Sequence, residues 1–293
     1  MDSESSVWRG RWLVLAAALL WSTSGFFAKA VVFKGVDSAG VALWPGPLLA
    51  FWRAIFASLV LVPMVRRPAW SWWLVPMTLC FAAMNWTFLT AMEAGTAAMA
   101  IWLQATAPMW VLLIGVFLFR EKFVRRDVVL ITLGLAGVLV ILVFELRGGN
   151  SWAVFNGLAS GVLYAWVVIF LRQLRAMDTA WLIALNHLVT ALLLSPYFFL
   201  SQQLPSGQQW IYLAAFGILQ MGIPYVLFSR GLRWLTGHEA SGIGLIEPVL
   251  VPIWVYIVWG EPVTWPIVVG GALIFTGLLL RFAGSSRPPA QTA

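Results

Sequence analysis

The sequence predicts an all-α membrane protein in which ten transmembrane helices form two inverted five-helix repeats around a central cavity. Three observations support this fold class. Of the 293 residues, 61% are hydrophobic and only 10% are charged, whereas soluble domains carry roughly 25% charged residues. The apolar residues fall into ten long stretches with short connections between them. The second half of the chain also weakly repeats the first, at an offset of 140 residues.

Each apolar stretch is long enough to cross a bilayer, because a helical span needs about 20 mainly apolar residues. The mean hydropathy of the whole chain is +0.90. No connection is long enough to hold a soluble domain. We expect membrane spans at residues 12–31, 47–65, 72–92, 95–119, 127–144, 151–171, 180–200, 209–229, 238–259 and 264–282.

Residues that match between the two halves predict the repeat. We expect the first repeat at residues 11–145 and the second at 151–283. Each repeat holds five spans, which is an odd number, so the second repeat would cross the membrane in the opposite sense. The matching pairs are Trp12 with Trp152, Ala100 with Ala240, Pro108 with Pro248, Glu121 with Glu261, and Gly137 with Gly277.

The charges of the loops agree with an inversion. The loop Arg120–Asp127 is strongly basic, whereas its counterpart Gly260–Ile267 holds no basic residue. Conversely, the turn at 93–95 has only an acidic residue, and its counterpart carries Arg230 and Arg233. Basic residues gather on the cytoplasmic side of membrane proteins. The two loops of each pair are therefore expected on opposite sides of the membrane.

The positions of the 18 lysines and arginines predict the orientation. If the amino terminus is cytoplasmic, Lys34 and Arg147 lie in outer loops and Lys29 and Arg53 lie within spans. All the others then face the cytoplasm, which is typical of the positive-inside rule. We expect a multi-pass protein of the cell (inner) membrane with both termini in the cytoplasm. The net charge of +7 is explained by these loops, so no nucleic-acid partner is expected.

The clearest motif lies in the ninth predicted span. It contains a Glu247-Pro248 pair, and Glu261 follows the end of the span. The first half has Ala107 at the position of Glu247, so this carboxylate is unique to one half. Further parts of the pattern are Pro252, Gly260 and Pro262 in the second half, Pro108, Arg120 and Glu121 in the first, the Trp21-Ser22 pair, and Arg53.

With these motifs, the chain resembles the EamA branch of the drug/metabolite transporter superfamily over residues 11–282. The resemblance implies that ten helices surround a central cavity, that substrate binds between the halves, and that small metabolites are transported, often outward. Exporters of aromatic and hydrophobic amino acids in this superfamily share the Trp-Ser-Thr sequence of Trp21–Thr23. The motifs recur in members with different cargo, so they do not fix the substrate.

Pro108 and Pro248 are the candidate hinge residues. Proline removes one backbone hydrogen bond and bends a helix, and paired breaks at matching positions of two repeats indicate a binding site. A packing kink is the structural alternative. Glu247 lies about halfway through its span, where an ionisable group is costly and normally faces the protein interior or water. It is expected to contact a substrate amine, to carry a proton, or to accept backbone hydrogen bonds.

Nine residues are predicted to line the substrate site. The aromatic members offer area and stacking for an apolar or aromatic cargo, and the polar members offer orientation. Packing against lipid or other helices is the alternative for each aromatic residue, and helix-to-helix hydrogen bonding is the alternative for each polar residue. The set is Trp21, Ser22, Asn85, Trp102, Gln104, Tyr164, Trp166, Tyr225 and Glu247.

The predicted function is secondary or facilitative transport of hydrophobic or aromatic amino acids by alternating access. The sequence contains no P-loop for ATP and has a single cysteine, so we expect no cofactor, metal site or catalytic residue. The expected partners are a small-molecule substrate and the lipid bilayer, and the oligomeric state stays open. Export of cationic drugs or nucleotide-sugar-like metabolites is the runner-up. An intramembrane enzyme that pairs Ser24 with His187, and a channel, are the rivals from other classes.

Overall fold

The structure is a computed structural model, which describes residues 2–36, 42–121, 125–201 and 203–283. The first half contains α1 (Asp2–Trp21), α2 (Ser24–Ala28), η1 (Val31–Phe33), α3 (Gly46–Leu61), η2 (Val62–Met64), α4 (Leu74–Ala94), α5 (Ala97–Gln104), α6 (Ala107–Phe119) and α7 (Arg125–Arg147). The second half contains α8 (Ser151–Gln173), α9 (Thr179–Ser201), α10 (Gln208–Gly217), the π-helical η3 (Ile218–Gly222), α11 (Ile223–Gly231), α12 (Gly237–Gly244), α13 (Ile246–Trp259) and α14 (Trp265–Ala283).

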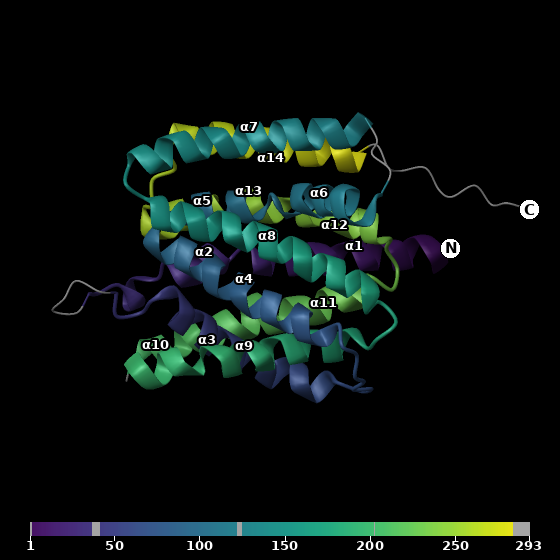
Figure 1. Ribbon diagram of the computed structural model, residues 1–293. Coiled ribbons are helices and arrows are strands. Elements are labelled where there is room, and N and C mark those ends of the chain that lie inside the picture. Colours follow the sequence, from purple (N-terminus) through teal and green to yellow (C-terminus); the bar gives the residue numbers. More distant parts are fainter. Residues whose placement is uncertain (1, 37–41, 122–124, 202, 284–293) are drawn as a thin grey trace, which may run out of the picture.

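The prediction of ten spans is confirmed. Nine helical segments of the described chain are long and apolar enough to cross a membrane, and Trp265–Arg281 is a tenth, shorter apolar helix. The helices run back and forth along one direction, and α1 begins at the same end of the bundle at which α14 ends (Figure 1). This arrangement requires an even number of crossings.

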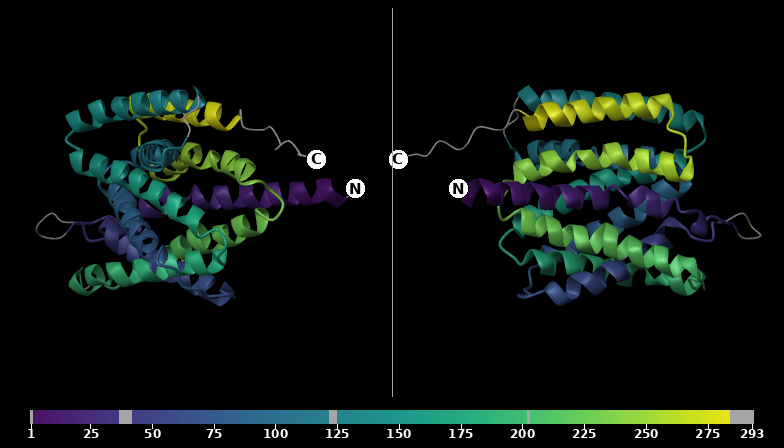
Figure 2. Two further views of the ribbon diagram at one scale, coloured as in Figure 1. Left: turned by 45° about the vertical axis from the view of Figure 1, so that its right-hand side comes forward. Right: turned by 180° about the vertical axis from the view of Figure 1, so that it is seen from behind.

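The helix contacts follow the two-fold pattern that paired repeats produce. The helix α4 packs on α8, and the equivalent contact in the second half joins α11 to α1. Two other extensive contacts, α3 with α9 and α7 with α14, each join a helix to its own counterpart. In both Figure 1 and Figure 2, α7 and α14 lie side by side as an outer layer of the bundle.

Glycines bring the backbones of α7 and α14 into contact. A Cβ atom on Gly137 would lie 2.5 Å from the carbonyl oxygen of Gly270, and one on Gly270 would lie 2.7 Å from that of Gly137. Both distances are too short for any side chain. Close approach through small residues is the usual way in which membrane helices associate, because lipid offers no hydrophobic driving force between them.

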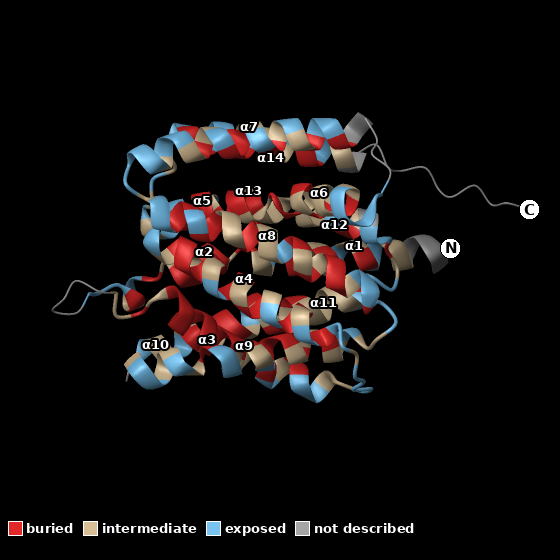
Figure 3. Cartoon of the chain, viewed as in Figure 1, coloured by how far each residue is buried: buried red, intermediate tan, exposed pale blue. Residues whose placement is uncertain are grey.

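Most of the arginines in the described residues lie toward one end of the bundle, which we call the basic end. It comprises the start of α1, the ends of α3, α6, α8, α11 and α14, and the described residues next to them. At this end Arg281 of α14 pairs with Asp127 of α7, with 2.8 Å between Nε and Oδ1. Burial is greatest toward the opposite end, around α2, α4 and α5 (Figure 3).

Candidate substrate site

Two spans are interrupted at equivalent places. The helix α5 ends at Gln104 and α6 begins at Ala107, while α12 ends at Gly244 and α13 begins at Ile246. The helices α5 and α12 have eight residues each and occupy equivalent positions in the two repeats. Irregular backbone at membrane depth is tolerated only where protein or a water-filled cavity surrounds it. We therefore expect both breaks to face protein or a water-filled cavity rather than lipid.

The predicted prolines lie just after these breaks. Pro108 is the second residue of α6, and Pro248 is the third residue of α13. In the first turn of a helix the backbone N–H groups have no intrahelical acceptor, so proline forfeits no hydrogen bond there. We expected each proline either to break and flex its span or to form a packing kink. In the structure each one lies in the first turn of the helix that follows a break.

A close helix contact holds the first break in place. A Cβ atom on Gly161 of α8 would lie 2.7 Å from the Leu103 carbonyl oxygen and 2.8 Å from Thr106 Oγ1. Thr106 donates a hydrogen bond to Leu103 O at 2.5 Å and accepts one from Trp110 Nε1 at 3.1 Å. The glycine thus lets α8 approach the interrupted backbone, as small residues do between membrane helices.

Two further interruptions exist only in one repeat each, and they meet. Ser22 and Thr23 separate α1 from α2, and the π-helical turn η3 contains Gln220. Gln220 Nε2 donates to the carbonyl oxygen of Trp21 at 3.2 Å. π-Helical turns occur frequently at functional sites. The two halves are thus joined at a point where both depart from regular helix.

Arg53 of α3 lies at the centre of a buried polar network. Its side chain is 1% exposed. The guanidinium donates to Asn85 Oδ1 and, at 3.5 Å, to Gln220 Oε1, and it lies 4.9 Å above the ring of Phe216. The ion pairs of the described residues do not include Arg53. A buried charge without a directly paired counter-charge is costly, and such groups in membrane spans mark functional sites.

Glu247 supplies the opposite charge at a distance. It lies in the first turn of α13 and is half-buried. It interacts electrostatically with Arg53, with Tyr164 of α8 and with Tyr225 of α11. Tyr164 is 42% exposed although it lies in the middle of its span. Four spans therefore direct ionisable or phenolic side chains to one region.

Aromatic rings complete this region. The Trp21 ring packs edge-on against Tyr225 with 5.2 Å between centroids. The Tyr225 ring lies 6.0 Å from that of His187, which is buried. Trp254 Nε1 donates to Ser22 Oγ at 2.9 Å. The predicted residues that the structure brings together are thus Trp21, Ser22, Asn85, Tyr164, Tyr225 and Glu247.

The other three predicted lining residues have different neighbours. Trp102 is 7% exposed, and its ring packs on Gly271 of α14. Trp166 stacks on Phe170 with 5.6 Å between centroids, in a cluster beside Leu74 of α4. Gln104 is the half-buried last residue of α5, at the break itself. A periodic apolar pattern does not reveal which face of a helix points inward, so the sequence did not separate these residues.

The sequence analysis did not single out Gln220 or Phe216. Both contact Arg53, and both lie between or beside Gly217 and Gly222. These two glycines allow α3 to approach closely, and together with Pro224 they are the local sequence signal that the segment is unusual. Among the described residues, no group of three or more His, Cys, Asp or Glu side chains is placed to hold a metal ion.

Paired helix breaks around a buried charged and aromatic centre define a membrane transporter. The chain matches the EamA-like transporter family over residues 8–143 and again over 151–283. It therefore belongs to that family, as the sequence motifs indicated.

Similar proteins agree with this assignment. An uncharacterized transporter of Archaeoglobus fulgidus is 27% identical over 284 residues, which cover 93% of this chain and 96% of the relative. The uncharacterized transporter YxxF of Bacillus subtilis is 26% identical over 210 residues, which cover 68% and 66%. A solved crystal structure of a protein shares the fold, with a TM-score of 0.66 at 20% identity, and covers 98% of this chain and 100% of its own.

Proposed function

We propose that this transporter is a secondary or facilitative exporter of hydrophobic or aromatic amino acids and works by alternating access. Its basic end faces the cytoplasm. The observation that carries the proposal is that Arg53 of α3 and Glu247, in the first turn after the break between α12 and α13, lie close enough to influence one another. They interact electrostatically but form no ion pair. Opposite charges that share one region without a direct ion pair suit a zwitterion.

An amino acid offers a group for each part of this region. Its ammonium group pairs with the Glu247 carboxylate. Its carboxylate is attracted by the positive potential of Arg53 and by the N-terminal end of α13, because helix N-termini of broken spans favour anionic groups. An apolar or aromatic side chain packs on the rings of Trp21 and Tyr225, which lie 5.2 Å apart.

A purely cationic cargo fits the same region less well. It would gain from Glu247 but would be repelled by Arg53, since both charges act on the same space. The other acidic residues of the described chain lie at or near helix ends, among them Glu93, Asp178 and Glu261. Cationic drugs therefore remain the second candidate, together with nucleotide-sugar-like metabolites.

The test is substrate flux in proteoliposomes that contain the purified full-length protein. Radiolabelled phenylalanine, leucine and lysine and a cationic dye are compared, each with and without a pH gradient. We expect phenylalanine and leucine to exchange and lysine and the dye to be excluded. Glu247→Gln should abolish the flux, whereas Glu145→Gln, at the end of α7, should not. Absence of flux across a broad amino-acid panel would refute the cargo, and exclusive flux of the dye would favour the second candidate.

A further inference from the structure

At the end of the bundle opposite the basic end, the Glu261 carboxylate connects the two halves of the chain. Glu261, just after α13, accepts a hydrogen bond from the backbone N–H of Ala97 at 2.7 Å. Its other oxygen lies 3.2 Å from Lys29 Nζ. Lys29 also donates to the carbonyl oxygen of Gly95 at 2.5 Å. Glu261 belongs to the second half of the chain and its partners belong to the first, so the contact joins the repeats.

This contact is shielded from solvent. The side chains of Lys29 and Glu261 are only 14% and 17% exposed. Beside them, Trp259 Nε1 donates to the Phe26 carbonyl oxygen at 2.8 Å, and the Phe26 ring stacks on that of Trp259 with 5.5 Å between centroids. Tyr212 of α10 stacks on the other side of Phe26, at 6.2 Å. Aromatic packing from three spans therefore closes this end around the ion pair.

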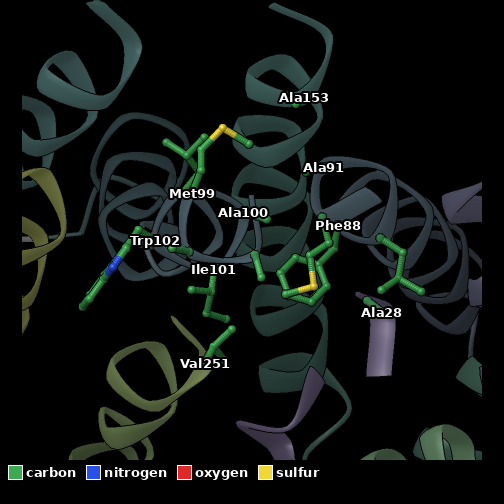
Figure 4. Packing of buried hydrophobic residues seen from close by; sticks show 14 of the residues in the cluster. Ala28, Phe88, Ala91, Met99, Ala100, Ile101, Trp102, Ala153 and Val251 are labelled. Carbon is green, nitrogen blue, oxygen red and sulfur yellow. The ribbon is translucent and has the colours of Figure 1, made fainter. Parts of the chain in front are cut away.

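The helix whose N-terminus Glu261 holds is buried along most of its length. Every residue of α5 from Ala97 to Leu103 is buried. Figure 4 shows Met99, Ala100 and Ile101 packed among residues of neighbouring helices, including Phe88 of α4 and Val251 of α13. A solute in the central region has no route past α5 while it is packed in this way.

The equivalent contact at the basic end is not made. Glu121, the counterpart of Glu261, has a side chain that is 51% exposed and lies 3.8 Å from Arg172. The helix α12, the counterpart of α5, is loosely packed. Ser241 and Gly242 are exposed, and a Cβ atom on Gly237, Gly242 or Gly244 would meet nothing within 4 Å.

The N-terminus of α12 is capped from within its own helix instead. Thr236 accepts a hydrogen bond from the Glu239 backbone N–H at 3.2 Å, and the Glu239 side chain completes a capping box. Glu239 also pairs with Arg11 of α1 at 3.0 Å. In α5 the N-cap is the equivalent Thr96, but the third helical residue is Met99, which has no carboxylate. The anion for α5 therefore comes from Glu261.

We propose that Glu261, Lys29 and the N-terminus of α5 form the gate that closes the end opposite the basic end. The α5 end is tightly packed in the structure, whereas Ser241 and Gly242 of α12 are exposed at the basic end. In the alternate state this gate opens, and Glu121 approaches the N-terminus of α12 at Gly237 as Glu261 approaches that of α5 at Ala97. The proposal rests on the alternating access proposed above, and it does not depend on the cargo.

The geometry separates this gate from a simple ion pair. The Glu261 carboxylate neutralises Lys29 and also accepts the Ala97 N–H, so a lysine at position 261 satisfies neither the N–H nor the partial positive charge of the helix end. Exchanging the two charges restores the ion pair but not the helix cap. Glu93 lies within electrostatic range of Lys29, so Lys29 keeps an acidic neighbour when Glu261 is neutralised.

The test measures access to two reporter cysteines in the full-length protein, with Cys80→Ser as the background. Ser24→Cys is the reporter near the gate. Ser24 begins α2, the short helix that ends next to Lys29, is 1% exposed, and its hydroxyl has no hydrogen-bond partner among the described residues. Gly242→Cys reports at the basic end, where α12 is open. A membrane-impermeant maleimide is applied to spheroplasts and to everted vesicles, so that each membrane face is examined without substrate.

We expect Ser24→Cys to react slowly from either face and Gly242→Cys to react rapidly from one. Glu261→Gln and Lys29→Gln should each raise the rate at Ser24→Cys by about tenfold, since charge-assisted hydrogen bonds hold the closed state, and should lower it at Gly242→Cys. In the Lys29→Glu/Glu261→Lys exchange, the labelling rate at Ser24→Cys should stay as high as in the single variants. Glu121→Gln, the matched control, should leave that rate unchanged or lower it.

Unchanged labelling in properly folded Glu261→Gln and Lys29→Gln proteins would overturn the gate. Full restoration by the charge exchange would overturn the role assigned to the α5 N-terminus. Size-exclusion profiles and melting temperatures identify variants that do not fold. Because labelling needs no substrate, a positive result stands even if amino-acid flux is absent, and flux without any change in labelling refutes the gate alone.

Discussion

Trp254 and Ser22 connect the two halves of the chain beside the broken first span. The indole Nε1 of Trp254 donates to Ser22 Oγ at 2.9 Å, and Ser22 donates to the Leu19 carbonyl oxygen at 2.7 Å. Ser22 is fully buried. One hydroxyl therefore serves both a backbone group near the break and a side chain of the opposite repeat.

Replacing this hydroxyl should destabilise the protein. Ser22→Ala leaves the Trp254 N–H without its acceptor, and an unsatisfied buried donor costs about 1–3 kcal/mol. We expect a lower melting temperature in detergent for Ser22→Ala and no change for Ser241→Ala, which is exposed. Trp254→Phe in the Ser22→Ala background should add little further loss. Independent, additive effects of the two substitutions would contradict the hydrogen bond.

Neutralising Glu247 should reduce transport without reducing the stability of the fold. Glu247 lies in the first turn of α13 and is half-buried, so glutamine fits the same space. We expect Glu247→Gln to melt within a few degrees of the parent and to lose at least about tenfold in amino-acid flux, the order expected when one charged partner is removed. Flux is measured across a pH series. A Glu247→Gln protein that transports with unchanged pH dependence would exclude Glu247 as a proton carrier.

Asp178, in the loop between α8 and α9, should make stability depend on acid. Partial burial raises its pKa, but backbone N–H donors of Arg66, Arg67, Ala180 and Trp181 outweigh this effect and lower the pKa below the ordinary value of 3.8. A lowered pKa in the folded state contributes stability above the unfolded pKa, and this stability is lost as pH falls through the folded pKa. Melting temperatures below pH 4 should therefore fall less for Asp178→Asn than for the parent. Equal slopes would contradict this role.

The contact of α7 with α14 should tolerate no side chain at Gly137. A Cβ atom there would lie 2.5 Å from Gly270 O and 2.8 Å from Ile274 Cγ1. Overpacking of this kind costs about 1–3 kcal/mol. We expect Gly137→Ala to lower the melting temperature, whereas Gly242→Ala, with nothing within 4 Å, should leave it unchanged or raise it. Equal melting temperatures for the two variants would show that these helices are not in backbone contact.

The ten spans and their pairing were predictable from the sequence because hydrophobic length and repeated residues determine them. Pro108 and Pro248 predicted an interruption of the fourth and ninth spans, and both spans are broken within a few residues of these positions. The repeat boundaries at 11–145 and 151–283 stay a prediction. The break in the first span was harder to predict. Its sequence signal is a run of small and hydroxyl residues, Ser22, Thr23, Ser24 and Gly25.

The membership of the site was less predictable. Trp102 and Trp21 look alike in sequence, yet the first packs on Gly271 and the second meets Tyr225. Their difference arises from helix rotation, which neighbouring spans determine. Gln220 lies in a π-helical turn and contacts Arg53. A single such turn does not change the apolar periodicity of the sequence enough to be predicted. The site thus depends on interruptions of regular helix, and residue helix propensities do not predict where these interruptions occur.

The unequal caps of α5 and α12 have a consequence for the resting population of the carrier. In the proposed gate, opening the end opposite the basic end removes the Glu261 carboxylate from the α5 N-terminus, whereas α12 keeps Glu239 whether or not Glu121 arrives. The two states therefore differ in free energy even without cargo, although the scaffold is two-fold. With the proposed gate, the empty protein rests with the α5 end closed, so cargo arriving from the basic end binds without a prior rearrangement.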